Sequence, residues 1–248
     1  MEDRARRTFT IPELFLGLLS LAVAVVLTAH IVADVIHDVR HTNDTINVTG
    51  SAHEPISANL VRWSLSVSGE AATAPRAARR LARDSAAVQA FLRGAGVSAS
   101  AISPSVVTSE QVVTQLAHHR RLVRYRVAQQ LEVSTHQIDV VERIAPTLGM
   151  LLQRGISVQA DPLEYLSTEL SQAKLQALGA ATQEAHRRAE ILVKGLGGKL
   201  GTMRSSTLGV YQITPRDSTN VSDYGINDTS TREKDVTAVV TATFAVNR

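Results

Sequence analysis

Residues 171–201 read SQAKLQALGAATQEAHRRAEILVKGLGGKLG, and this stretch decides the fold. Alanine recurs at every fourth position, as Ala173, Ala177, Ala181, Ala185 and Ala189. A four-residue period places these alanines on one ridge of a helix. Small residues on one ridge let a helix lie close against a sheet or another helix. We therefore predict a closely packed helix over residues 171–196.

The glycines of residues 195–201 resemble a dinucleotide-binding loop only superficially. Such a loop joins a strand to the start of a helix, whereas this segment follows a helix. We interpret it as the C-cap and turn that end the helix.

The chain ahead of this helix contains the patterns of strands and two further helices. Alternating apolar residues predict strands over residues 46–48 and 60–67, separated by a segment that Pro55 interrupts. Apolar residues at helical spacing predict one helix over residues 73–94 and another over 138–152, with a break at Pro146. The first of these helices carries arginines on its polar side without a recognition motif, so we expect no nucleic-acid partner.

Residues 102–113 and 122–133 predict a pair of strands, the second of which alternates apolar residues with Arg124 and Arg126. His118 to Arg121 is interpreted as the turn between them. Adjacent histidines on a strand point to opposite faces, so a metal shared by His118 and His119 is geometrically awkward.

Two interpretations compete for residues 156–169. Asp161-Pro162-Leu163-Glu164 has the form of a capping box, and local rules therefore favour a helix that begins there. The alternative is that residues 156–158 and 163–166 form two strand pieces around a proline interruption.

Several of these segments together resemble the SIMPL-domain family. The segments that carry the resemblance are residues 46–50 (INVTG), Gly96-Val97, Tyr125-Arg126, residues 185–190 (AHRRAE), residues 196–201 (LGGKLG) and a closing strand over residues 235–246. Residues 209–215 (GVYQITP) and 222–230 (SDYGINDTS) resemble the long loop of a membrane-anchored subgroup of that family. The resemblance covers the chain from about residue 46 to its end.

The resemblance implies an α+β domain of mixed strands and three helices, in which residues 163–167 form a strand. It also implies export across the inner membrane of a bacterium and assembly into ring-like or other large oligomers. Associations with envelope or oxidative stress are usual in the family. The family has no agreed active site, so the resemblance implies no catalytic residue and no cofactor.

The N-terminal apolar segment predicts a single transmembrane helix. Its leucine, isoleucine, valine and phenylalanine side chains give an insertion free energy of about −4 to −7 kcal/mol. Arg4, Arg6 and Arg7 precede it, so the positive-inside rule places the N-terminus in the cytoplasm. A cleaved signal peptide is the alternative, although its apolar region is usually shorter. The predicted parts are a cytoplasmic N-terminus (1–13), a transmembrane anchor (14–36), a juxtamembrane spacer (37–44) and an extracytoplasmic SIMPL domain (45–248).

Composition excludes several kinds of chemistry. The chain has no cysteine, which excludes disulfides, thiol catalysis and thiolate metal sites. A net charge of +3 supports no argument for an acidic partner. The sequence contains no nucleophile elbow, zinc-protease motif or phosphate-binding loop, so we predict no catalytic site, no metal and no cofactor.

Two residue groups keep alternative functions open. Asp34, His37, Asp38 and His41 share one helical face at a spacing that suits a divalent metal, although we favour a polar juxtamembrane helix as their explanation. An enzyme of unrecognised class would have to use the titratable groups near the end of the chain, namely Asp223, Tyr224, Asp228, Glu233 and Lys234.

Residues 209–234 form a predicted loop that is too polar for a core and longer than the ~12–15 residues of an idle connection. We predict that it docks on a neighbouring subunit or partner, with Tyr224 buried in the contact. The predicted interaction residues are Tyr211, Gln212, Pro215, Asp223, Tyr224, Ile226 and Asp228. The sequence thus predicts an oligomeric structural or interaction module of the bacterial inner membrane, whose partners are the bilayer, copies of itself and other envelope proteins. The alternatives are a small-ligand or metal-binding envelope protein, or an enzyme.

Overall fold

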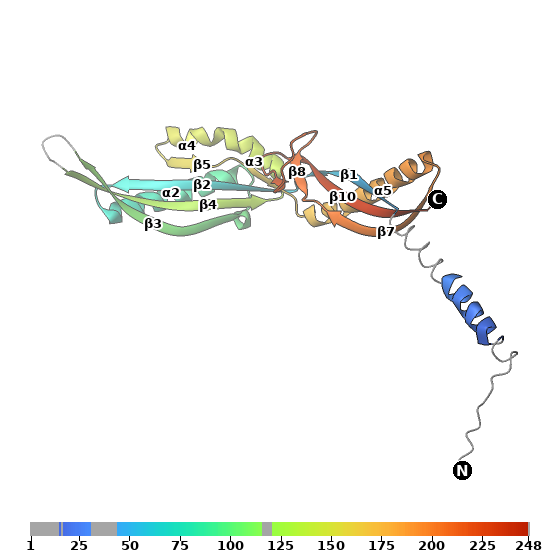
Figure 1. Ribbon diagram of the computed structural model, residues 1–248. Coiled ribbons are helices and arrows are strands. Elements are labelled where there is room, and N and C mark those ends of the chain that lie inside the picture. Colours follow the sequence, from blue (N-terminus) through green and yellow to red (C-terminus); the bar gives the residue numbers. More distant parts are fainter. Residues whose placement is uncertain (1–14, 16, 31–43, 116–120, 248) are drawn as a thin grey trace, which may run out of the picture. The chain divides into compact units, whose positions relative to one another are not determined.

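The computed structural model describes residues 15, 17–30, 44–115 and 121–247. Helices and strands are mixed along the chain, so the predicted α+β class is confirmed (Figure 1). The elements are β1 (Thr45–Ser57), β2 (Leu60–Ala71), α2 (Ala74–Gly94), η1 (Ala99–Ala101), β3 (Ile102–Gln115), β4 (Arg121–Thr135), α3 (Ile138–Ile144), η2 (Ala145–Leu148), α4 (Gly149–Gln153), β5 (Ser157–Ala160), β6 (Glu164–Leu166), α5 (Leu170–Gly195), β7 (Lys199–Leu208), β8 (Gln212–Pro215), β9 (Ile226–Asn227) and β10 (Glu233–Asn247).

The chain divides into two compact units, whose boundaries fall inside β1, α5 and β10. Unit 1 contains the described residues up to Gly50, Thr182–Leu208 and the chain from Val240 onward. Unit 2 contains Ser51–Ala181 and Gly209–Val239.

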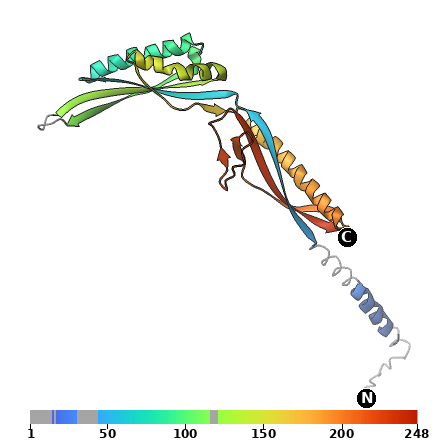
Figure 2. The ribbon, with the colours of Figure 1, turned by 90° about the horizontal axis from the view of Figure 1, so that it is seen from above.

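Unit 2 is built on an antiparallel sheet with strand order β3-β4-β2-β5, in which β6 also pairs with β2. Alternate residues of β2 are buried, as expected of a strand with one face on a core. The helix α2 and the α3–α4 segment lie on the same side of this sheet (Figure 2). Trp63 and Leu65 of β2 form the core with Leu131 of β4 and with Val88 and Leu92 of α2.

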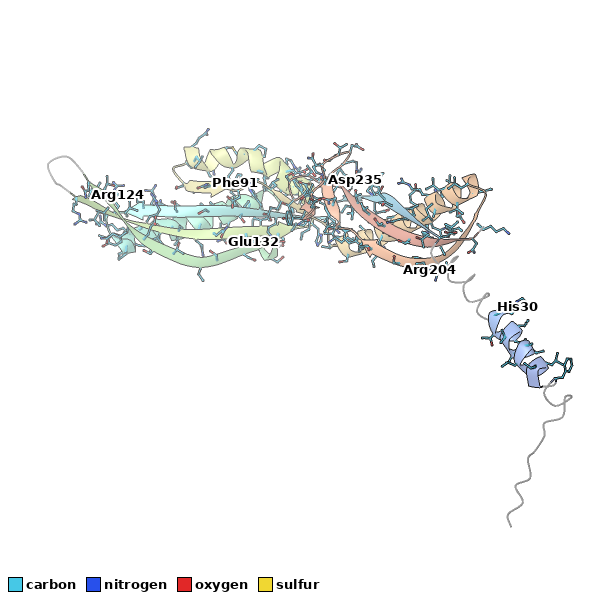
Figure 3. The ribbon with its side chains drawn as sticks, in the orientation of Figure 1. His30, Phe91, Arg124, Glu132, Arg204 and Asp235 are labelled. Atoms are coloured by element: carbon cyan, nitrogen blue, oxygen red, sulfur yellow. The ribbon has the colours of Figure 1, made fainter. Side chains whose placement is uncertain are left out.

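The predicted pair of strands is confirmed as the β3–β4 hairpin. Residues 121–124 of β4 pair with β3 but not with β2, and Arg124 lies on this extension (Figure 3). Nearly every residue of β3 is exposed on both faces. Of the predicted turn over residues 118–121, only Arg121 belongs to the described residues.

The predicted capping box at Asp161 is wrong. No helix begins there, and the segment forms the two strand pieces β5 and β6, both paired with β2. Asp161 bridges them, because its N–H donates to the carbonyl of Ser64 at 3.0 Å and its carbonyl accepts from the indole of Trp63 at 3.1 Å. Pairing with β2 therefore satisfies backbone groups that a helix would have satisfied internally. The strand that the family resemblance implied is confirmed.

Two smaller predictions also need correction. Pro55 does not interrupt β1, which lies at the edge of its sheet, the position in a sheet that tolerates proline. The break predicted at Pro146 is confirmed, since the 3₁₀ turn η2 contains Pro146 and separates α3 from α4, but the expected number of helices is wrong, because four rather than three lie among residues 44–115 and 121–247.

Unit 1 contains the second half of the alanine helix. Ala185 and Ala189 are fully buried against Val48, Ala242 and Phe244, and the three remaining alanines of the ridge are buried in unit 2. The predicted packing of the ridge is therefore confirmed.

The turn that follows α5 also agrees with the prediction. Gly197 has a φ of +81°, the left-handed conformation typical of the residue after a helix, and the N–H of Gly198 donates to the carbonyl of Val193 at 3.0 Å. The chain then enters β7, which pairs antiparallel with the end of β10.

Of the predicted anchor, residues 15 and 17–30 are described, and they are helical and exposed. Within the described residues, no helix has both the length and the apolar character of a membrane span.

Candidate interaction site

The predicted interaction loop contains part of a sheet. Its strand β8 pairs antiparallel with residues 234–237 of β10, and β9 pairs with β8 in parallel. Gln212, Ile213 and Thr214 of β8 are buried, so the expectation that this segment is too polar for the core is wrong there. Pairing with β10 and β9 satisfies backbone groups of β8, and the Gln212 amide nitrogen donates to the carbonyl of Ser222 at 2.7 Å, whereas Gln212 Oε1 is buried with no hydrogen-bond partner among the described residues.

The carboxylate of Asp228 organises the return of the loop to β10. One oxygen accepts from the N–H and hydroxyl of Ser230 at 3.0 and 2.6 Å. The other accepts from the N–H and hydroxyl of Thr231 and from the ammonium of Lys234, the last at 2.9 Å. Burial opposes ionisation, but the hydrogen bonds from Ser230, Thr231 and Lys234 outweigh it and hold the pKa of Asp228 well below its usual range.

Lys234 supplies the positive charge at this point. It is 2% exposed, and its ammonium also donates to the main-chain carbonyl of Asp228 at 2.7 Å. A counter-charge and two hydrogen-bond acceptors offset the desolvation cost of a buried ammonium, which an unpaired ammonium would carry in full. The pair therefore fixes the path of residues 228–234.

Further contacts hold the same segment against the body of unit 2. The N–H of Tyr165 on β6 donates to the carbonyl of Thr229 at 2.7 Å. Arg232 lies 2.6 Å from a carboxylate oxygen of Asp139 and 3.6 Å from one of Glu142, both on α3. Burial, together with the carboxylate of Glu142, raises the pKa of Tyr165.

The other end of the loop is held by Arg216. Its guanidinium lies 3.2 Å from Glu233 and 3.8 Å from Asp235, which is on β10 (Figure 3). The N–H of Asp217 donates to the carboxylate of Asp235 at 3.1 Å. Both ends of the loop are thus fixed, and we call residues 212–216 and 226–235 the loop base.

Residues 217–225 project from this base, and we call them the loop tip. Tyr224 is 97% exposed and Val221 is 81% exposed. The tip therefore presents an aromatic and an aliphatic side chain to solvent on a support that is itself ordered.

The predicted interaction residues divide between these two parts. Asp228 forms contacts within the base, Gln212 of the base donates to Ser222 of the tip, and Pro215 and Ile226 are half-buried in the base. Tyr211 is half-buried, with the Lys174 ammonium 5.5 Å from its ring centroid. Of the predicted interaction residues, only Asp223 and Tyr224 are exposed and lie on the tip.

Sequence reasoning missed Val221 as a tip residue and Arg216 and Arg232 as supports. The hydrogen-bonding part of the base did leave a signal, because Asp228 is followed by Ser230 and Thr231. An Asp that accepts from the backbone two or three residues later is the common Asx-type turn.

A family model described as "SIMPL: Protein of unknown function (DUF541)" matches residues 46–244. The chain belongs to the SIMPL family. The match includes the loop base, the loop tip and the strands that support them. Because the SIMPL family is one of unknown function, membership assigns no activity to these residues. The curated proteins include no match to this chain.

Most of the side chains proposed for an enzyme have structural partners in this SIMPL protein. Asp228 and Lys234 bind each other inside the base, Glu233 pairs with Arg216, and Tyr224 is exposed on the tip. Within residues 15, 17–30, 44–115 and 121–247, no group of three or more His, Asp or Glu side chains is arranged to hold a metal ion. The alternative metal ligands Asp34, His37, Asp38 and His41 lie outside the described residues.

Proposed function

We propose that this SIMPL protein is a membrane-anchored interaction module of a bacterial envelope, which associates with copies of itself or with an envelope protein through the loop tip. The observation that carries the proposal is the fully exposed Tyr224 on a fixed base. The residues that resemble the membrane-anchored subgroup include residues 222–225 of this tip. The arginines ahead of the apolar segment 14–36 support an inner-membrane location with the domain outside the cytoplasm.

The physical argument concerns the cost of ordering. A loop that becomes ordered only on binding loses conformational entropy at that moment, which weakens the complex. Here the ion pair of Asp228 and Lys234 and the contacts of Arg216 and Arg232 order the base beforehand. Tyrosine is among the residues that contribute most to interfaces, since it combines a large apolar ring with a hydroxyl.

Light scattering after size exclusion tests the contact, with the full-length protein in detergent. Tyr224→Ala combined with Val221→Ser removes both exposed tip side chains and leaves every contact of the base in place. We expect a smaller molar mass with an unchanged circular dichroism spectrum. Asn220→Ala, an exposed polar change on the same tip, is the matched control and should keep the wild-type mass. Ile226 is not suitable for this test because it is half-buried in β9.

The edge strand β3 offers a second surface for self-association. It has exposed backbone groups on its free edge, and Val106 and Val107 are 82% and 55% exposed. Long edges with few charges pair readily with another strand. Val107→Lys should leave the molar mass unchanged if the tip is the contact. If Val107→Lys lowers the mass and the tip variant does not, assembly occurs through β3 and the proposed role of the tip is wrong.

Protease protection tests the location and orientation. Protease added outside spheroplasts should remove the domain beyond residue 44 and leave an N-terminal fragment protected. A chain that stays intact in spheroplasts but is digested after lysis would contradict the proposed orientation.

A further inference from the structure

The C-terminal end of α5, in unit 1, exposes large aliphatic side chains. Ile191 is 64% exposed, Leu192 is 50% exposed and Leu196 is 86% exposed. The opposite side of the same turn is packed, since Val193 is 2% exposed and Ala189 is fully buried. A single exposed leucine is ordinary, whereas three large aliphatic residues within six positions form a patch.

Two lysines accompany this patch. Lys194 and Lys199 line an open groove of about 600 Å³ together with Ile191. Among the described residues, neither lysine forms an ion pair within 4.0 Å, and Glu190 in the same groove lies 3.7 Å from His186. The ammonium groups are therefore available to an anion outside unit 1.

The patch lies where the chain enters unit 1. A second groove, of about 690 Å³, is lined by Leu196 together with Asp44, Ile46 and Val246. The N–H of Val246 donates to the carbonyl of Asp44 at 2.8 Å, which fixes the entry point beside Leu196. Residues 31–43 join this point to the helical residues 17–30, and a chain of that length reaches at most about 45 Å.

We propose that this surface, formed by Ile191, Leu192, Lys194, Leu196 and Lys199 and here called the α5-end patch, docks on the anionic lipid surface of the bilayer. The inference rests on the membrane anchor proposed above. The aliphatic side chains enter the boundary between headgroups and acyl chains, and the two ammonium groups bind lipid phosphates.

The composition and position of the patch favour lipid over a protein partner. Aliphatic side chains beside lysine suit the headgroup region, where the long lysine stems follow apolar surface and the ammonium groups reach the phosphates. Protein interfaces are depleted in lysine and enriched in aromatic residues, which the α5-end patch lacks. A tether short enough to keep the patch near the bilayer also raises its effective concentration there.

The absence of cysteine makes a direct test possible, because any introduced cysteine is the only one in the chain. The variant Leu196→Cys is labelled with an environment-sensitive fluorophore. Its emission is measured in the full-length protein reconstituted in phosphatidylglycerol-containing vesicles and is compared with that of a control variant. Leu175→Cys is the matched control, since Leu175 is 69% exposed on the same helix but is not part of the patch. Flotation of the same vesicles tests the anchor separately.

We expect a blue-shifted emission at position 196 that brominated lipid quenches, and an unshifted, unquenched emission at position 175. Replacing both lysines, as Lys194→Glu with Lys199→Glu, should weaken the preference for anionic over zwitterionic vesicles by about fivefold or more per lysine.

The outcomes separate this inference from the anchor. If the protein floats with vesicles and the two positions behave alike, the anchor stands and lipid docking is wrong. If the label at position 196 is shifted but brominated lipid does not quench it, protein covers the patch and lipid docking is again wrong. If the protein does not float at all, both the anchor and the docking are wrong.

Discussion

Replacing Lys234 with methionine should strongly destabilise unit 2. The substitution keeps the length and the apolar stem of a side chain that is 2% exposed, and it removes the ammonium 2.9 Å from the carboxylate of Asp228. Removing one partner of a buried ion pair costs about 3–5 kcal/mol, because the other charge stays buried without compensation. Ser230 and Thr231 still donate to this carboxylate, so we expect a loss near the lower limit, about 3 kcal/mol.

Tryptophan fluorescence during urea unfolding measures this loss in the correct part of the molecule. Trp63 is the only tryptophan of the chain, is 2% exposed and belongs to the core of unit 2. The Lys234→Met variant should show a lower midpoint at an unchanged slope, which identifies a change in stability alone.

Two further variants decide whether the ion pair is the cause. Asp228→Asn combined with Lys234→Met removes both charges and should recover part of the loss. Arg204→Met, an exposed change on β7 of unit 1, should leave the Trp63 transition unchanged (Figure 3). A loss below about 1 kcal/mol for Lys234→Met would be typical of a surface salt bridge, and it would refute the role given to this buried pair.

Gly69→Ala should lower the midpoint of the Trp63 transition, at a cost of about 1–3 kcal/mol, because the added Cβ would lie 2.7 Å from the main-chain oxygen of Ala77; wild-type stability would mean that α2 shifts freely. Ala181→Leu should cost about 1–3 kcal/mol by overpacking a fully buried position, whereas the exposed neighbour Ala180→Leu should cost little in thermal unfolding. The stabilisation from Asp228, whose folded pKa is lowered, is fully present above its unfolded pKa of about 3.9 and is lost as the pH falls through the folded value. The stability difference between wild type and Asp228→Asn should therefore shrink below about pH 4 in urea titrations, and a constant difference would contradict the assignment.

The long helix was predictable from sequence because its signal repeats. Alanine recurs five times at a four-residue spacing, and glycines mark the end of the helix. One misleading residue therefore does not change the prediction. The β3–β4 hairpin was predictable for the same reason, since period-two alternation continues along β4. In both elements the pattern repeats over so many residues that a single residue that departs from it does not change the prediction.

The segment around Asp161 was not predictable from local rules. Asp161 to Glu164 satisfies every local requirement of a helix start, yet the free edge of β2 accepts this segment as β5 and β6. The stabilisation comes from pairing with β2, which lies about one hundred residues earlier in the chain. The residues around Asp161 therefore contain no local pattern that predicts it. The family resemblance supplied the correct answer because it describes the whole fold.

The loop base illustrates a second kind of limit. Asp228 and Lys234 are both visible in the sequence as titratable residues, and an enzyme site and a structural ion pair have the same composition. Burial distinguishes them, because Lys234 is enclosed and its charge is matched within the loop. Asp228 lies outside any strand or helix, so its six-residue separation from Lys234 of β10 gives no register from which this pairing follows.

The division into base and tip has a physical reason that also limits what the tip can do. A polar loop becomes ordered only when its charges and backbone groups find partners, and here Asp228, Lys234, Arg216 and Arg232 find them inside unit 2. The charges of these side chains are therefore already paired within unit 2, whereas the ring of Tyr224 has gained no burial. Hot-spot tyrosines contribute about 2 kcal/mol or more, a factor of about 30 in affinity, and the tip variant should lose at least that much if the contact occurs. A loss spread evenly over the charged residues of the base would instead show that the base itself opens on binding, and the proposed contact through a preformed tip would have to be abandoned.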